Sequence, residues 1–264
     1  MMRRSSLRSG RSFRLAALVP TWTGGSGERF SRWWPHIRGF IGEIAIIVIG
    51  VLIALGADNI VSTLRDKAAS AEARATIRDE LAENLGRMVE RDATRNCIDA
   101  RLDQLARHLD ASDEGAAQPA LKWIGRPQVW PMLDSRWQAT ASAGKASLLS
   151  SKEQGDFGAI YANIRDFQDN QQTEQLAWAQ LRAMAGRTRL PPQESAMLRF
   201  ALQNARYAAW QSHIIVWQVT QDAARLGIKP MTQMKGSRSI CIPTSTSFDD
   251  AVRQAGASLF GEPR

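Results

Sequence analysis

An apolar run between residues 40 and 57 constrains this chain more than any other feature of its sequence. Only Glu43 among these 18 residues is charged. As a helix with a rise of about 1.5 Å per residue, the run would span about 27 Å, close to the ~30 Å thickness of the hydrocarbon layer of a bilayer. The segment 44–57 has no polar face, whereas a soluble helix of this length normally has one. We therefore predict a transmembrane helix over residues 37–57.

Tryptophans and charged residues mark the ends of this run. Trp33 and Trp34 precede it, where aromatic residues are enriched at the interface between lipid and water, and Arg38 stands at the polar edge. Glu43 would lie about one turn inside that edge, so its carboxylate is expected to reach the headgroups. The residues that define the predicted membrane helix are Phe40, Gly42, Glu43, Gly50, Ala54 and Asp58.

Two other interpretations of the run stay open. Ala54 and Gly56 are small residues of the kind that signal peptidase needs, so cleavage near Gly56 would release an exported soluble helical protein. The arginine-rich region before the run is long for a signal peptide, which argues against cleavage. The other alternative is a core helix of a soluble protein, and the absence of a polar face argues against it.

Arginines gather at the amino end and set the predicted orientation. The formal net charge is +8, but residues 1–38 hold eight arginines and one glutamate, and the remaining charges nearly balance. The body therefore lacks the basic surface that nucleic-acid binding needs, and we predict no nucleic-acid partner. Lys and Arg residues close to the two ends of the run are equal in number, three on each side. The arginine-rich tail then favours an amino end in the cytoplasm and a body outside it.

Small residues on the predicted membrane helix are compatible with a homodimer. Gly42, Gly50 and Ala54 recur at multiples of four, so they lie on one stripe where two helices could approach closely. Small residues are common in membrane helices, and the stripe alone does not identify a partner. The expected partners are the lipid bilayer, a second copy of the chain, and a membrane or periplasmic protein.

Two blocks of the sequence resemble a bacterial family of uncharacterised single-pass membrane proteins. The segments 42–44, 50–55 and 58–59 are similar to its signature "GE…IGILIAL…N". The stretch 136–161 resembles its second block, with matches at Trp137, Gly144, Leu148, Leu149 and Tyr161. The chain departs from the family at Gly56-Ala57 and in its long arginine tail. The resemblance implies an envelope membrane protein with a helical domain outside the membrane, and it supplies no known activity and no catalytic residues.

The expected organisation has three parts. Residues 1–36 form a disordered basic cytoplasmic tail, residues 37–57 the transmembrane helix, and residues 58–264 a periplasmic helical domain. In the domain, apolar residues recur at helical spacing up to about residue 112, with a break expected near 91–96. Further helices are expected at residues 132–143, 151–185 and 191–226 and after Ser247, and an extended piece at 239–243. The predicted fold is all-α, a bundle of three to four main helices after the membrane helix.

Local signals support individual elements of this bundle. Ser150 and Glu153 form a capping-box pattern at the start of the helix predicted at 151–185. In the helix predicted at 191–226, the expected buried side carries Leu198, Leu202, Ala205, Trp210, Ile214 and Trp217. Acidic pairs such as Asp79 and Glu80 are expected on solvated helix faces or at helix caps.

Cys97 and Cys241 are the only cysteines of the chain. An even pair in an oxidising compartment favours a disulfide, which would join the first helix of the domain to its carboxyl-terminal part. The alternative is two buried free thiols, which a cytoplasmic body would require. We predict the disulfide.

No residue pattern identifies a reaction. His36, His108 and His213 have no ligand-like spacing, and no phosphate-binding glycine loop or nucleophile elbow occurs. Trp178, Trp210 and Trp217 could line a ligand groove, although tryptophans at helical spacing more often belong to the core. We therefore predict no catalytic, metal or cofactor site. The predicted function is that of a non-enzymatic, membrane-anchored envelope protein whose domain binds a protein or a ligand.

Overall fold

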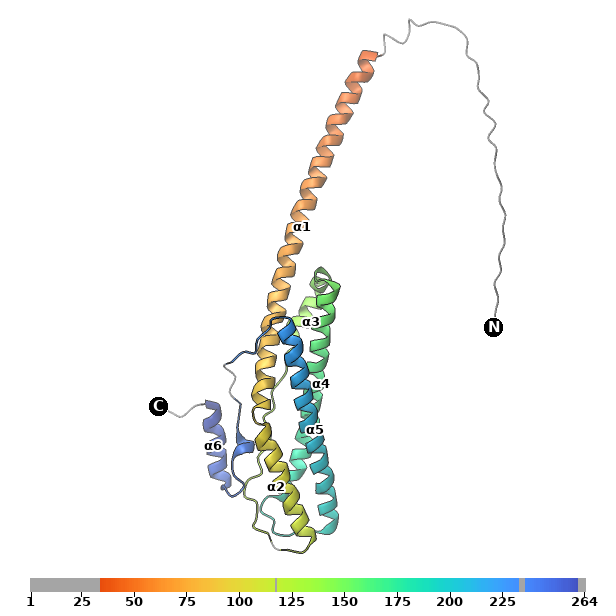
Figure 1. Ribbon diagram of the computed structural model, residues 1–264. Helices are drawn as coiled ribbons and strands as arrows, with labels where there is room; N and C mark the ends of the chain where they lie inside the picture. The colour runs from red at the N-terminus through yellow and green to blue at the C-terminus, as the bar shows by residue number, and fades with distance from the viewer. Residues whose placement is uncertain (1–33, 117, 233–235, 261–264) are drawn as a thin grey trace, which may run out of the picture. The chain divides into compact units, whose positions relative to one another are not determined.

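The computed structural model describes residues 34–116, 118–232 and 236–260, with side chains from residue 42 to residue 256 within these ranges. No strand occurs in this described part, and the predicted all-α fold is confirmed (Figure 1). The α-helices are α1 (Trp34–Asp92), α2 (Arg95–Asp113), α3 (Ser135–Ser142), α4 (Ser151–Leu181), α5 (Pro192–Arg225) and α6 (Phe248–Phe260). Short 3-10 turns are η1 (Lys145–Leu148), η2 (Arg182–Met184) and η3 (Ser239–Cys241). Most of the predicted tail, residues 1–33, lies outside the described residues.

The chain divides into two compact units between Val61 and Ser62. The described part of the first unit is the amino-terminal part of α1, and its large apolar side chains are exposed. An 18-residue window within Gly42–Asp92 has a mean hydropathy of 2.5, and none of it is buried. Within the described ranges, α1 is the one helix long and apolar enough to cross a membrane. The predicted span 37–57 thus falls on a candidate membrane helix.

The second unit is a helical bundle with two hydrophobic clusters. Ile77, Leu81 and Leu85 of α1 belong to the first, together with apolar residues from the amino-terminal part of α4 and the carboxyl-terminal part of α5. The second joins α2 to the opposite ends of the same two helices, around the fully buried Trp178. Figure 1 shows α4 and α5 as a helical hairpin with α2 beside it. The predicted bundle is therefore confirmed.

The break between α1 and α2 falls at Ala93-Thr94, inside the predicted window 91–96. Thr94 is buried, and its hydroxyl donates to the carbonyl of Arg91 at 2.8 Å. A threonine hydroxyl that donates to a carbonyl of the preceding turn competes with the backbone hydrogen bonds of the helix. This contact therefore favours the end of α1 at this point.

The amino end of α4 carries the predicted capping box. Ser150 accepts from the amide of Glu153, and the Glu153 carboxylate accepts from the amide of Ser150. Arg74 of α1 also pairs with Glu153, its Nε lying 2.5 Å from Oε1. The guanidinium of Arg74, followed by the capping hydrogen bonds, lowers the pKa of Glu153 to about 2. The same carboxylate therefore starts α4 and ties it to α1.

Glu80 is buried, so of its two predicted places, a solvated face or a helix cap, the solvated face is wrong. Its carboxylate accepts from the Tyr161 hydroxyl at 2.6 Å and from the backbone amides of Arg136 and Trp137 at 2.9 and 3.2 Å. These two amides belong to the first turn of α3, where helix amides have no partner within the helix. Burial, together with the hydrogen bond to Glu80, raises the pKa of Tyr161. Glu80 thus acts as a cap for α3 supplied by another helix.

A fully buried ion pair joins α1 to α4. Arg91 Nη2 lies 2.7 Å from Glu174 Oε1, and the two side chains are 2% and 1% exposed. Arg91 Nε has no hydrogen-bond partner among the described residues. Charges buried this deeply depend on each other, because removal of one leaves the other without compensation in a medium of low polarity.

The predicted disulfide is present. Cys97 of α2 is bonded to Cys241 of η3, with 5.0 Å between their Cα atoms. The segment 239–243, predicted as extended, begins with the turn η3 and is extended only from Ile242. The disulfide therefore fixes this turn against α2.

Candidate interaction surface

Small residues on the inner face of α5 set its rotation in the bundle. Ala201, Ala205, Ala208 and Ser212 are all buried. From α4, the Asn170 amide donates to the carbonyl of Ala208 and to the hydroxyl of Ser212, both at 2.8 Å. Because these side chains are short, α5 can lie close to α4 along this face.

Ion pairs of two arginines and a hydrogen bond of one histidine along one edge of α5 join it to α2 and the end of α1. The basic residues are seven apart, at Arg199, Arg206 and His213. Their partners are Asp110 (2.8 Å) and Asp113 (2.5 Å) for Arg199, Asp103 (2.8 Å) for Arg206, and Asp92 (3.0 Å) for His213. The hydrogen bond from Ser195, followed by Arg199, lowers the pKa of Asp113. Exposed pairs contribute little stability each, but their spacing defines which face of α5 points outward.

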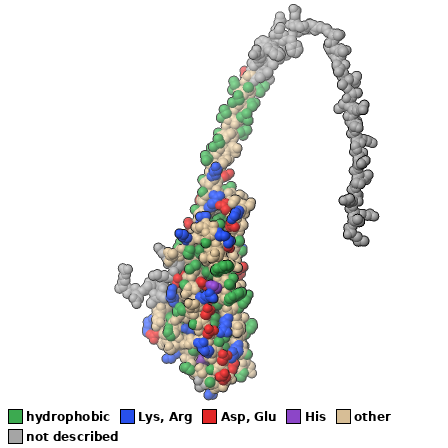
Figure 2. Space-filling model, viewed as in Figure 1, with side chains coloured by type: hydrophobic (Ala, Val, Ile, Leu, Met, Phe, Trp, Pro, Cys, Tyr) green, Lys and Arg blue, Asp and Glu red, His purple; other side chains and the backbone are tan. Residues whose placement is uncertain are grey.

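That outward face carries a row of large apolar side chains, which we call the α5 stripe. Its members and exposed fractions are Met197 (71%), Phe200 (69%), Tyr207 (62%), Trp210 (57%) and Trp217 (58%). Successive members are three or seven residues apart, the spacing of the a and d positions in a coiled coil. Figure 2 shows hydrophobic side chains over α5 on the face in view, among acidic and basic ones.

The expected burial of Trp210 and Trp217 is therefore wrong. The buried residues of α5 continue from Leu202 through Ala205, Ala209, Ser212 and Val216. At 100° per residue, Trp210 and Trp217 lie roughly a third of a turn away from this row. Trp178 of α4 is fully buried, so the structure does not bring the three tryptophans together into a groove.

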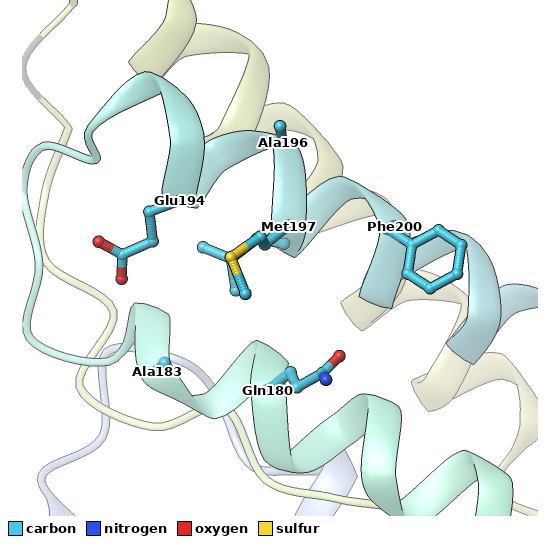
Figure 3. A pocket seen from close by; sticks show the side chains of 7 residues that line it. Gln180, Ala183, Glu194, Ala196, Met197 and Phe200 are labelled. Carbon is cyan, nitrogen blue, oxygen red and sulfur yellow. The ribbon is translucent and has the colours of Figure 1, made fainter.

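A hollow of about 520 Å³ opens at the amino-terminal end of the stripe. Gln180 and Ala183 line it on one side, and Glu194, Met197 and Phe200 of α5 on the other. Figure 3 shows Met197 extending from α5 into the space beside Ala183 and Gln180, with Phe200 further along the same helix. Apolar residues dominate this lining, and the Glu194 carboxylate pairs with Arg187. The hollow can accept an apolar side chain from a neighbouring molecule.

The flank of the stripe next to α4 is polar and uncharged. It consists of Asn204, Gln211 and Gln218 at intervals of seven residues. An amide side chain both donates and accepts hydrogen bonds, so this flank can pair with an identical flank. Large exposed patches rimmed by polar residues are typical of interaction sites.

The predicted membrane residues lie on α1. Gly42, Gly50 and Ala54 are exposed, as are Glu43 and Asp58. A Cβ added at Gly42 or Gly50 would meet no atom within 4 Å. Phe40 lies in α1, but its side chain is outside the described ones. The role of these residues in pairing stays a prediction.

The α5 stripe is the exposed surface feature that sequence reasoning missed. Its signal was the heptad spacing of Phe200, Tyr207, Trp210 and Trp217, which runs beside the buried row. Among the described side chains of residues 42–256, there is no group of three or more His, Cys, Asp or Glu residues that could hold a metal ion.

The chain matches no family model, no curated protein and no solved structure. The resemblance to the single-pass membrane family therefore stays a prediction.

Proposed function

We propose that this chain is a non-enzymatic protein of the bacterial inner membrane that acts by binding through its periplasmic domain. The observation that carries the proposal is the apolar part of α1, which is long enough to span a bilayer and has no buried residue in its most hydrophobic window. In a bilayer, lipid would cover this surface. In water, the same surface would stay in contact with solvent, at a free-energy cost of about 25 cal/mol for each Å² of apolar area.

The disulfide supports the proposed side of the membrane. Cys97 and Cys241 are bonded, and disulfides persist in oxidising compartments such as the periplasm. The arginine-rich tail supports an amino end in the cytoplasm. These two independent features favour the same orientation.

Two engineered cysteines test the topology. Ala141→Cys places a thiol on an exposed position of α3, and Ser9→Cys places one in the tail. We expect a membrane-impermeant maleimide to label A141C in intact cells and S9C only after lysis. Alkaline carbonate should leave the full chain in the membrane fraction. Protection of A141C or extraction by carbonate would contradict the proposal, and a mature chain beginning at Ala57 would identify the exported soluble alternative.

A second copy of the chain is the partner that best fits the α5 stripe. Five large side chains, each more than half exposed, offer an apolar area on the order of 500 Å². A specific interface needs about 1,000 Å² in total, or about 500 Å² on each partner, so the stripe reaches this lower bound and its amide flank adds to it. The flank is uncharged and can pair with itself, and symmetric homodimers are built from one self-complementary patch.

Substitution within the stripe tests this pairing. For Tyr207→Gln with Trp210→Gln, we expect a monomer in non-ionic detergent where the unchanged chain is a dimer, because both aromatic rings at the centre of the stripe are lost. The readout is molar mass by light scattering after gel filtration. Val252→Gln, which removes an exposed apolar side chain from α6, is the control and should stay dimeric. A monomeric unchanged chain, or a dimer that survives both substitutions in the stripe, would exclude this interface.

A further inference from the structure

A second hollow, of about 390 Å³, has a different chemical character from the one at the α5 stripe. It lies between the loop 122–126, the turn η2 and α6. Its lining combines three basic side chains, Lys122, Arg126 and Arg182, with the aromatic rings of Trp123 and Phe248. The described residues that line it include no acidic side chain. Its volume lies within the range of small-molecule sites.

The walls of this hollow are fixed by specific contacts. The indole N–H of Trp123 donates to the carbonyl of Ser239 at 2.8 Å, and the Ser239 hydroxyl donates to the carbonyl of Arg126 at 3.0 Å. Gly125 has a φ of 72°, and a Cβ there would lie 2.6 Å from the Ser239 oxygen, so only glycine allows this approach. The disulfide at Cys241 holds the same segment against α2. The shape of the hollow is therefore fixed by hydrogen bonds, a close backbone contact and the disulfide.

Among the described residues, no acidic side chain pairs with the three cations around the hollow. Arg126 donates to the neutral side-chain amide of Gln175 at 2.8 Å. Lys122 and Arg182 form no ion pair with any described residue. By contrast, Arg199 and Arg206 of α5 both pair with aspartates. Like charges that line one concave surface focus a positive potential, which an anion would relieve.

The aromatic part of the lining is open to a ligand. Phe248 is 66% exposed, although its ring centroid lies only 5.9 Å from that of Trp123. The two rings are tilted by 58°, so they leave the outer face of Phe248 uncovered. A flat apolar group can stack on such a face and remove it from water. Arginine and lysine beside it are suited to a phosphate or carboxylate.

We propose that this hollow binds a small molecule in which a phosphate or carboxylate is joined to a flat aromatic group. Lys122, Arg126 and Arg182 contact the anionic group, and Phe248 with Trp123 contacts the ring. The site lies apart from the α5 stripe, and its occupation does not require a dimer.

Phenyl phosphate is a probe that carries both parts of this ligand. We expect it to bind the full chain in non-ionic detergent with a Kd of about 1 mM or tighter, measured by titration calorimetry. Inorganic phosphate tests the anion alone and benzyl alcohol the ring alone, and each should bind at least about tenfold more weakly. No saturable binding of phenyl phosphate, or equal binding of inorganic phosphate, would overturn the proposal.

Matched variants locate the binding. Lys122→Gln with Arg182→Gln should weaken phenyl phosphate about tenfold or more, because two charge-assisted contacts are lost. Phe248→Ala should weaken phenyl phosphate by about three- to tenfold and leave inorganic phosphate unchanged. The controls are Arg165→Gln, an exposed cation of α4, and Leu176→Ala, an exposed apolar side chain of α4; both should bind like the unchanged chain. Equal affinity in the hollow variants and their controls would overturn the assignment.

Discussion

Loss of the Cys97–Cys241 disulfide is expected to lower the free energy of unfolding by about 4–5 kcal/mol. The two cysteines are 144 residues apart, so the bond closes a large loop in the unfolded chain. In the chain-entropy model, such a closure lowers the conformational entropy of the unfolded chain. The folded state is therefore stabilised relative to the unfolded one. For a domain of this size, the Tm should fall by about 10–15 °C.

Tryptophan fluorescence of the full chain in non-ionic detergent measures this effect. The double variant Cys97→Ser with Cys241→Ser should have a Tm about 10–15 °C below that of the unchanged chain. Addition of dithiothreitol should lower the Tm of the unchanged chain to the same value. The double variant is its own control, since the reductant has no bond left to break in it. A Tm that stays within about 2 °C of the unchanged chain would show that the loop closure does not stabilise the domain.

Glu174→Leu is expected to destabilise the domain by about 3–5 kcal/mol. Its partner Arg91 is 2% exposed and would keep a charge that no other described acid within 4 Å balances. Arg91 Nε already has no hydrogen-bond partner in the described part of the chain, so the guanidinium depends on Glu174. The measurement is the free energy of unfolding from urea titrations.

Two controls separate this buried pair from an ordinary loss of contact. Arg91→Met together with Glu174→Leu should recover most of the stability, because an apolar pair of similar volume leaves no charge buried. Arg206→Gln breaks the pair with Asp103, in which both side chains are more than a third exposed, and should cost at most about 1 kcal/mol. If Glu174→Leu costs no more than Arg206→Gln, the pair does not hold α1 to α4.

Features with a local signal in the sequence were predictable. The break between α1 and α2 was expected near 91–96 and falls at Ala93-Thr94. The capping box of Ser150 and Glu153 was also predicted correctly, because it depends on residues three positions apart. The disulfide followed from the presence of two cysteines and a compartment inferred from the apolar run.

Features that depend on contacts between distant elements were not predictable. Glu80 looks like any acidic residue on a helix surface until α3 is placed with its free amides against it. In α5, the large aromatic residues suggested the core, whereas close packing on α4 selected alanine and serine for the buried face. The basic hollow draws on residues from 122 to 255, and no short motif announces such a site.

The seven-residue interval that α5 repeats makes this helix sensitive to changes in its length. Arg199, Arg206 and His213 keep that interval along one edge, and Phe200 and Tyr207 keep it on the adjacent face. A single inserted residue would turn everything that follows by about 100°, which separates the basic residues from their aspartates and directs aromatic rings toward α4. An insertion of seven residues would turn it by only about 20° from the starting direction. In α5, therefore, a change of one heptad preserves the direction of both faces, whereas a shift by a single residue misdirects both faces of the helix at once.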